Sequence, residues 1–217
     1  MIIGICGFIG SGKDTIADYL VNVQHFRRMS FAATLKDAVS SVFGWDRELL
    51  EGRTQHSRDW REQRDEWWSQ RLGREITPRL ILQLWGTEVC RQGFHDEIWV
   101  ASLENRLRRC EDNVVITDCR FPNEIRAINS AGGRVIRVQR GPEPEWYELA
   151  AAANQGSFAA REELAKYQVH ASETAWVGYK FDAVIDNNGT MDHLYSQLNC
   201  LIQGLQPSTE DPVSESQ

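Results

Sequence analysis

The sequence lacks the cysteine pairs and the long apolar runs that mark several classes of protein. Its five cysteines are scattered and include no Cys-x-x-Cys pair, which argues against a zinc cluster and against a disulfide framework. No segment approaches the roughly 18 to 20 apolar residues that a membrane-spanning helix requires. No basic segment precedes the first apolar residues, so we expect no signal peptide. These absences predict a cytoplasmic protein with no membrane partner.

Positive charge is also scarce, and lysine is the scarcer of the two basic residues. The formal net charge is −7, whereas broad nucleic-acid binding requires a basic surface, so we expect no nucleic-acid partner. All the basic residues other than Lys13, Lys36, Lys166 and Lys180 are arginines. The planar guanidinium of arginine suits bidentate contacts with phosphate.

The chain does contain a glycine-rich loop of the phosphate-binding type. Residues 7–15 read Gly-Phe-Ile-Gly-Ser-Gly-Lys-Asp-Thr, after the apolar run 2–6 and before a helical pattern. A strand, a glycine turn and a helix N-terminus are the context that such a loop requires, because its backbone N–H groups and the helix dipole both favour an anion. We therefore predict a nucleoside triphosphate site. Its expected ligands are Gly10, Ser11, Gly12, Lys13, Asp14 and Thr15.

One position of this loop departs from the usual pattern. The lysine is normally followed by Ser or Thr, whose hydroxyl orders Mg²⁺, whereas Asp14 follows Lys13 here and Thr15 comes next. The sequence therefore predicts an altered magnesium position. We expect Asp14 or Thr15 to order the Mg²⁺ that accompanies ATP, directly or through water.

Apolar periodicity predicts strands that alternate with helices. Alternation of this kind indicates an α/β fold, in which a mostly parallel five-stranded sheet carries helices on both faces. The expected strands are 2–6, 27–31, 114–117, 134–139 and 181–185, and 79–91 is expected to form one helix.

The length fits one domain, which we place at residues 1–205. Within it, residues 45–79 are dense in charge and tryptophan and predict a helical insertion, whose aromatic side chains pack inward or stack on bases. Residues 142–168 predict an exposed helical excursion. Residues 206–217 have little apolar content and predict a disordered tail.

Charged residues follow the third expected strand. Asp118 comes directly after 114–117, and Arg120 lies two residues further on. Ligands of open parallel sheets bind at the carboxyl ends of the strands, so this segment should lie beside the glycine-rich loop. An acid at this place can hold magnesium or a substrate hydroxyl, and the guanidinium can hold phosphate. A capping aspartate and a surface arginine are the alternative interpretation.

In order and spacing, residues 1–204 resemble the deoxynucleoside monophosphate kinases of tailed bacteriophages, within the P-loop kinases. Gly-Lys-Asp-Thr is this family's form of the loop, which accounts for Asp14. The segments that carry the resemblance are 11–18, 35–38, 83–88, 98–100, 118–120 with Glu124, His170 with Glu173, and 184–189.

The resemblance implies a three-layer P-loop kinase fold with a helical insertion. It implies transfer of the γ-phosphoryl group of ATP to a deoxynucleoside 5′-monophosphate with Mg²⁺, with Lys13 and Arg120 as catalytic residues. It places the monophosphate in the helical region of about 33–99 and a lid at about 142–168. The expected ligands of the monophosphate are Lys36, Asp37, Arg58, Arg79, Gly86, Thr87, Trp99, Asp118, Arg120 and Glu124.

Some parts of this interpretation stay open. Alignment through 45–79 is loose, so Arg53, Arg61 or Arg64 can take the place of Arg58. Related enzymes make a homodimer a reasonable expectation, and the cytoplasm is that of the host if the chain is phage-encoded. A kinase of dephospho-coenzyme A or phosphomevalonate would carry the same loop. A nucleotide-binding switch without kinase activity is the other alternative, although the chain has no Asn-Lys-x-Asp guanine motif.

Overall fold

Five short segments pair into one sheet in the computed structural model, which describes residues 1–205. The strands lie in the order β2-β3-β1-β4-β5, and every pairing is parallel. The expected disorder of 206–217 lies outside the described residues. The strand bounds are β1 Ile2–Cys6, β2 Arg27–Met29, β3 Val114–Ile116, β4 Arg134–Gln139 and β5 Ala183–Asp186.

Alternating side chains of the strands face two separate hydrophobic cores. Ile3 and Ile5 of β1 pack with helices α1 (Lys13–Asn22) and α12 (Met191–Leu205). Cys6 belongs to the opposite core, together with residues of α7 (Ile98–Leu107) and α8 (Pro122–Ser130). A strand directs successive side chains to opposite faces, so β1 is covered by helices on both sides. The predicted three-layer α/β fold is confirmed.

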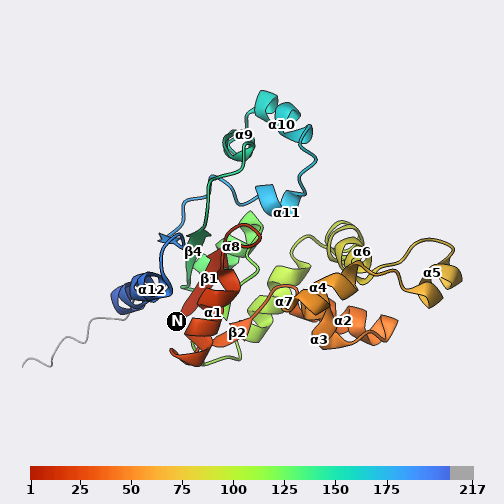
Figure 1. Ribbon diagram of the computed structural model, residues 1–217, viewed down its shortest axis with the longest axis horizontal. Helices are drawn as coiled ribbons and strands as arrows, with labels where there is room; N and C mark the ends of the chain where they lie inside the picture. Colours follow the sequence, from red (N-terminus) through yellow and green to blue (C-terminus); the bar gives the residue numbers. More distant parts are fainter. Residues whose placement is uncertain (206–217) are drawn as a thin grey trace, which may run out of the picture.

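A chain of short helices projects from one side of the sheet (Figure 1). Each of four of them starts at a polar side chain that accepts hydrogen bonds from the first turn; the capping residues are Asp46, Thr54, Asp65 and Thr77. Most of the tryptophans pack inward, as Trp45 does on Phe43 at 4.6 Å between ring centroids, whereas Trp67 is exposed. The helices of this arm are α2 (Ala33–Phe43), α3 (Arg47–Glu51), α4 (Gln55–Glu62), α5 (Glu66–Leu72) and α6 (Pro78–Leu84).

Residues 79–91 are helical as predicted, but the helix changes type within this range. The α-helix α6 ends at Leu84, and a π-helix, η1 (Trp85–Gln92), follows it. The indole Nε1 of Trp99 donates a hydrogen bond to the carbonyl oxygen of Gly86 at 2.9 Å. A side chain from another helix thus binds a carbonyl in the first turn of η1, and π-helical turns of this kind are frequent at functional sites.

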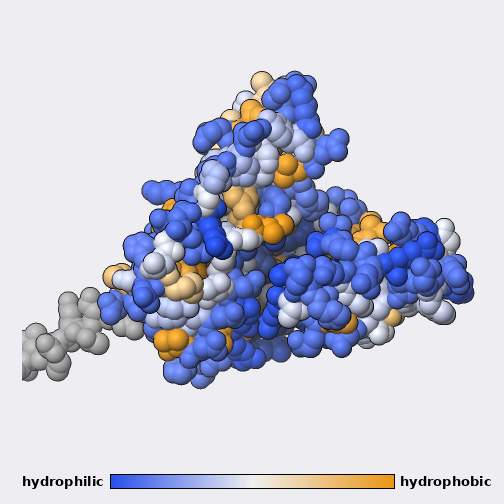
Figure 2. Space-filling view, in the orientation of Figure 1, coloured by the Kyte–Doolittle hydropathy of each residue, from blue (hydrophilic) through white to orange (hydrophobic). Residues whose placement is uncertain are grey.

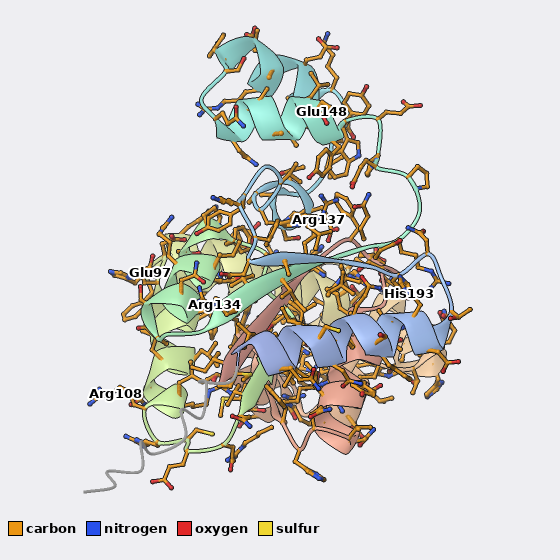
Figure 3. The ribbon with its side chains drawn as sticks, turned by 90° about the vertical axis from the view of Figure 1, so that its left-hand side faces the viewer. Glu97, Arg108, Arg134, Arg137, Glu148 and His193 are labelled. Atoms are coloured by element: carbon orange, nitrogen blue, oxygen red, sulfur yellow. The ribbon has the colours of Figure 1, made fainter. Side chains whose placement is uncertain are left out.

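A second arm rises from the carboxyl end of β4 (Figures 1 and 3). It holds α9 (Tyr147–Asn154), α10 (Phe158–Ala165) and α11 (Ala171–Thr174). Arg137 of β4 fixes its base by pairing with Glu143 and donating to the Tyr147 hydroxyl at 2.7 Å.

Within residues 1–205, no helix combines the length and the apolar character that crossing a membrane requires.

Candidate functional site

A cavity of about 660 Å³ opens at the carboxyl ends of β1 and β3. The space-filling view shows the surface hollowed between the body of the molecule and the two arms (Figure 2). The chain leaves β1 for β2 at one edge of the sheet, returns to β3 beside β1, and then crosses to β4 and β5 on the other side, so its direction reverses next to β1. A crevice at such a reversal is the usual ligand site of an open parallel sheet.

The glycine-rich loop joins β1 to α1 at one end of this cavity. Gly7, Gly10 and Gly12 have φ angles of +149°, +80° and +100°, which L side chains rarely adopt. A Cβ atom on Gly12 would also lie 2.2 Å from Nδ2 of Asn187. That nitrogen donates to the carbonyl oxygen of Ser11 at 2.8 Å, so the segment after β5 holds the loop in place.

Lys13 folds back over the loop that precedes it. Its Nζ donates to the carbonyl oxygens of Gly7 and Phe8, each at 2.7 Å. Burial, reinforced by the positive charge of Arg120, lowers the pKa of Lys13 to about 8. The ammonium therefore lies in a partly desolvated place where its attraction for phosphate is strong.

The two residues after Lys13 lie in different places. Asp14 lines the cavity at its rim, and its largely exposed carboxylate pairs with Arg28 at 3.4 Å. Thr15 instead lines a separate hollow with Tyr19 and Tyr195. Within residues 1–205, no group of three or more His, Cys, Asp or Glu side chains could hold a metal ion by itself. A lone carboxylate beside a phosphate loop fits Mg²⁺ that arrives with ATP, since this ion is commonly bound by one or two carboxylates and substrate phosphates.

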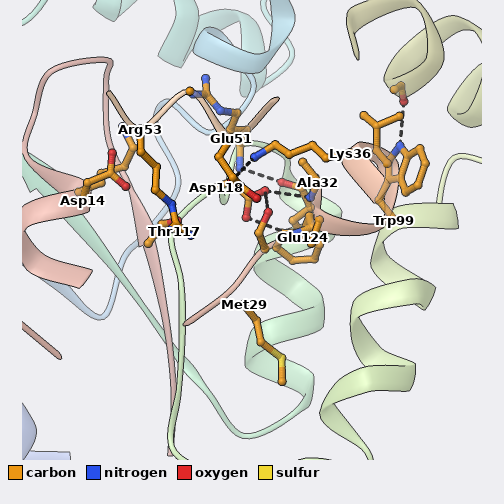
Figure 4. A pocket seen from close by; sticks show the side chains of 18 of the residues that line it. Asp14, Met29, Ala32, Lys36, Glu51, Arg53, Trp99, Thr117, Asp118 and Glu124 are labelled. Carbon is orange, nitrogen blue, oxygen red and sulfur yellow. Dashed lines mark hydrogen bonds and ion pairs between the residues drawn. The ribbon is translucent and has the colours of Figure 1, made fainter. Parts of the chain in front are cut away.

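Asp118 organises the neighbouring loop. Its carboxylate accepts hydrogen bonds from the Ser30 hydroxyl at 2.8 Å and from the backbone N–H groups of Phe31 and Ala32, both at 3.0 Å (Figure 4). Three donors from one turn fix the chain between β2 and α2. Asp118 lines the cavity as predicted, and the geometry gives it a role in shaping the wall.

Arg120 lies between the loop and the second arm. Its side chain lines the cavity, is about one third exposed, and pairs through Nη1 with Glu173 of α11. Its backbone N–H donates to Oε2 of Glu124 at 2.8 Å. Lys13 and Arg120 both line the cavity, and the positive charge of Arg120 helps to lower the pKa of Lys13. A pair of cations at this edge can hold adjacent phosphate groups.

Glu124 is buried at the start of α8 and forms the centre of a polar network. One carboxylate oxygen caps the helix by accepting from Arg120 and Phe121, and the other pairs with the buried Arg91 of η1. Burial, followed by the negative charge of Asp118, raises the pKa of Glu124 to about 7. The network joins the π-helix to the segment that carries Arg120.

Lys36 and Asp37 were both expected to bind the monophosphate, but only Lys36 reaches the cavity. Its Nζ pairs with Glu51 at 2.7 Å (Figure 4). The positive charges of Lys36 and Arg47 lower the pKa of Glu51 to about 2, against the effect of burial. Asp37 is largely exposed, pairs with Arg47 at 2.6 Å and does not line the cavity. Asp37 therefore acts on the site only indirectly, by pairing with Arg47, which also pairs with Glu51.

Four arginines from the segment 53–79 line the cavity, namely Arg53, Arg58, Arg61 and Arg79. Arg58 donates to the backbone carbonyl of Arg53 at 3.3 Å, and Arg79 pairs with Glu62. Arg64, the remaining alternative from the sequence, does not line the cavity. The structure thus brings both expected arginines to the site together with two of the three alternatives.

Arg61 is the most unusual member of this group. Its guanidinium lies against Gly52, where an added Cβ would be 2.1 Å from Cζ. Its Nε is buried and has no hydrogen-bond partner among the described residues. Burial, together with the positive charges of Arg79 and Arg58, lowers its pKa. A half-buried cation that lacks a partner and faces a cavity is arranged to receive an anion.

The remaining predicted ligands form the apolar wall of the cavity. Gly86, Thr87 and Trp99 all line it. The indole of Trp99 is only 8% exposed and is fixed through its bond to the Gly86 carbonyl, so the ring forms a wall edge (Figure 4). A Cβ on Gly86 would approach Leu35 to 3.0 Å, which shows how closely η1 lies against α2.

Comparison with known proteins bears on this arrangement. No family model matches the chain. A protein of Acanthamoeba polyphaga mimivirus, assigned as a deoxynucleotide monophosphate kinase, is 30% identical over 213 residues, which cover 91% of this chain and 94% of the relative. The chain belongs to the deoxynucleoside monophosphate kinases. The deoxynucleoside-5′-monophosphate kinase of Escherichia phage T5 is likewise 30% identical, over 57% of this chain and 70% of its own length.

Solved structures resemble this monophosphate kinase only distantly. Shikimate kinase from Aquifex aeolicus covers 94% of the chain at 14% identity with a TM-score of 0.44. The protein TT1252 from Thermus thermophilus covers 95% at 18% identity with a TM-score of 0.43. Both TM-scores lie below 0.5, so the fold is assigned from the strand order and the family from the sequence matches.

Several charged residues of this family member reach the site without having been predicted there. Glu51, Arg91 and Arg106 line the cavity, and Glu173 pairs with Arg120. Glu173 is one of the residues that carry the family resemblance, but the sequence did not predict that it pairs with Arg120. Arg91 and Glu51 gave no such signal, because a single charged residue in a charged helix is most often solvent-exposed.

The raised pKa of Glu124 gives this kinase a specific dependence of stability on pH. A carboxyl whose pKa is raised in the folded state contributes stability that is fully present below its unfolded pKa and is lost as pH rises through the folded value. The shift from 4.5 to about 7 corresponds to as much as about 3 kcal/mol. We expect the free energy of unfolding of the wild type to fall by up to this amount, relative to Glu124→Gln, as pH rises across that interval.

Urea denaturation of both proteins at several pH values measures this difference. The exposed Glu104 of α7 offers a control, and Glu104→Gln should follow the wild type at every pH. Parallel stability curves for the wild type and Glu124→Gln would contradict the assignment.

Proposed function

We propose that this chain transfers the γ-phosphoryl group of ATP to a deoxynucleoside 5′-monophosphate, giving the diphosphate and ADP. One observation carries the proposal: a single cavity joins the glycine-rich loop and Lys13 to a group of arginines that includes Arg61, whose buried Nε has no hydrogen-bond partner within residues 1–205. A donor phosphate site and an acceptor anion site in one cavity are what phosphoryl transfer requires. The names of the two viral relatives indicate which acceptor this is.

The proposed acceptor site has a charged part, which binds the phosphate, and a less polar part, which faces the base and sugar. Arg61 and Arg120 approach the phosphate of the monophosphate, with Arg58 and Arg79 at the rim. The wall formed by Gly86, Thr87 and Trp99 faces the base and sugar, because these residues contribute apolar surface and few charges. Asp118 and Glu124 shape the site through the backbone that they bind.

The reaction needs charge neutralisation more than proton transfer. An oxygen of the acceptor phosphate attacks the γ-phosphorus, and the bond to the bridging oxygen of ADP breaks. A phosphate monoester with a second pKa of about 6 is already anionic at neutral pH, so no strong general base is required. Lys13 and Arg120 stabilise the charge that spreads over the transferred group. Asp14 would hold the Mg²⁺ of ATP, which neutralises phosphate charge when bound.

We also propose that the two arms have separate tasks. The helical region of about 33–99 contributes the acceptor side of the cavity, and the excursion of about 142–168 serves as a lid. Phe8 of the loop lies 4.6 Å from Trp176, between ring centroids, so the base of the lid arm contacts the donor site. Contact of this kind supports closure over bound nucleotide, which keeps water from the transferred group.

Initial rates of ADP release test the proposed reaction. The acceptors are dGMP, dTMP, dCMP, dAMP and the four ribonucleotides at fixed Mg²⁺-ATP, with dephospho-coenzyme A and phosphomevalonate as comparators and ATP alone as background. We expect turnover above background with at least one deoxynucleoside monophosphate and none with the comparators. ADP release confined to a comparator would overturn the proposal, and so would a protein that binds ATP and turns over no acceptor.

A further inference from the structure

Glu173 contacts Arg120 from outside the part of the cavity already described. The two side chains form an ion pair through one carboxylate oxygen and Nη1 of the guanidinium, and the exposed fraction of Glu173 is only 17%. Among residues 1–205, Nε and Nη2 of Arg120 form no hydrogen bond with the protein. One side of the guanidinium is therefore held and the other is available for a phosphate oxygen.

Hydrogen bonds within the second arm hold α11, the helix that carries Glu173, in place. His170 caps α11 by accepting from the backbone N–H of Ser172 at 3.2 Å. Asn154 of α9 donates to the carbonyl oxygens of Thr174 and Val177 at 2.8 and 2.9 Å. A carboxylate on a segment fixed in this way can orient its partner.

The base of α11 also contacts the donor loop directly. Trp176 is buried against Phe8 of the loop, and Arg137 lies over its ring at 5.4 Å from the centroid. Any displacement of the second arm would move Glu173 together with these aromatic contacts. Because Glu173 pairs with Arg120, the position of the Arg120 side chain depends on the position of the second arm.

We propose that Glu173 is a positioning residue for phosphoryl transfer: it holds one side of Arg120 so that the other side faces the transferred group. This inference rests on the proposed function, because it assigns Arg120 to that reaction. A bidentate guanidinium bridges two anions well, since its donors lie in one rigid plane. Glu173 and a phosphate oxygen can bind at the same time and need not compete.

Glu173→Gln is expected to lower kcat by about tenfold or more, because partners that orient a functional group contribute effects of this size. The KM for the acceptor should change by a smaller factor than kcat, since Arg61 and the other arginines of the cavity still contact the acceptor phosphate. In an Arg120→Ala background the same substitution should have no further effect on kcat. Glu163→Gln, which removes an exposed carboxylate paired with Lys166 on α10, should leave kcat unchanged.

These outcomes separate positioning from the alternatives. A Glu173→Gln variant with unchanged or raised kcat would overturn the proposal, and a raised value would identify Glu173 as a competitor of phosphate. An equal loss of kcat in the wild-type and Arg120→Ala backgrounds would also overturn it, because a purely structural role does not depend on Arg120. The rates are measured with whichever acceptor supports the fastest ADP release, so this proposal and the choice of acceptor fail independently.

Discussion

Arg120→Ala is expected to lower kcat by on the order of 10³-fold, the effect of removing a cation that stabilises a transferring phosphoryl group. The side chain lines the cavity, and its charge acts on Lys13. The fold should survive, because the structural contact at this position is the backbone N–H that Glu124 binds. Among residues 1–205, the guanidinium itself pairs with Glu173 alone. A coupled assay of ADP release measures kcat, and circular dichroism verifies folding.

Arg126 provides the matched control for this substitution. It lies six residues further along the chain, on an exposed position of α8. Arg126→Ala removes the same charge from the same helix region and should leave kcat within about twofold of the wild type. Full turnover by a folded Arg120→Ala protein would remove Arg120 from the mechanism and leave Glu173 without a role in it.

The donor half of the site could be predicted because its chemistry lies in consecutive residues. The apolar strand β1, the glycine loop and the start of α1 form one local unit, in which backbone conformation follows from the glycines. The segment Asp118–Arg120 was equally accessible, since parallel strands deliver their carboxyl ends to one edge. Order along the chain therefore predicts that both segments lie at the same edge of the sheet.

The acceptor half depends on contacts between distant residues, which spacing does not reveal. Arg58 and Arg61 lie three residues apart on α4, on the same face of a polar helix. Their different surroundings arise from Gly52, whose missing side chain leaves room for the Arg61 guanidinium. The π-helix η1 is another case, since the indole that binds its first turn comes from α7. Asp37 and Thr15 follow the family pattern yet do not line the cavity.

Ion pairs across the site were the least predictable feature. Arg91 pairs with Glu124, 33 residues away, and Arg120 pairs with Glu173, 53 residues away. Although Arg120 and Glu124 were expected at the site, nothing in the sequence indicates which distant charged residue pairs with each of them. Burial makes these ion pairs necessary, because a charged group in a partly desolvated site either pairs with an opposite charge or shifts its pKa.

Arg61→Met is expected to raise the KM for the acceptor by about 10²-fold while kcat changes by less than about fivefold. Two charge-assisted hydrogen bonds to a phosphate, each contributing about 1.5 kcal/mol, account for an effect of this size. Methionine keeps an unbranched apolar stem that can lie against Gly52. The variant should unfold at the same or a higher temperature than the wild type, because it loses a half-buried charge that lies near Arg79 and Arg58 and whose Nε has no hydrogen-bond partner in the described part of the chain.

Two further substitutions decide which arginine of this region binds the acceptor. Arg64→Met removes an exposed guanidinium that pairs with Glu66 at 3.4 Å outside the cavity, and it should leave KM unchanged. Arg58→Met should raise KM less than Arg61→Met does, because Arg58 already donates to a backbone carbonyl and is exposed. If KM rises more in Arg58→Met than in Arg61→Met, the acceptor phosphate binds to Arg58 at the rim of the cavity and not to Arg61. The unpaired Nε of Arg61 would then need a structural explanation.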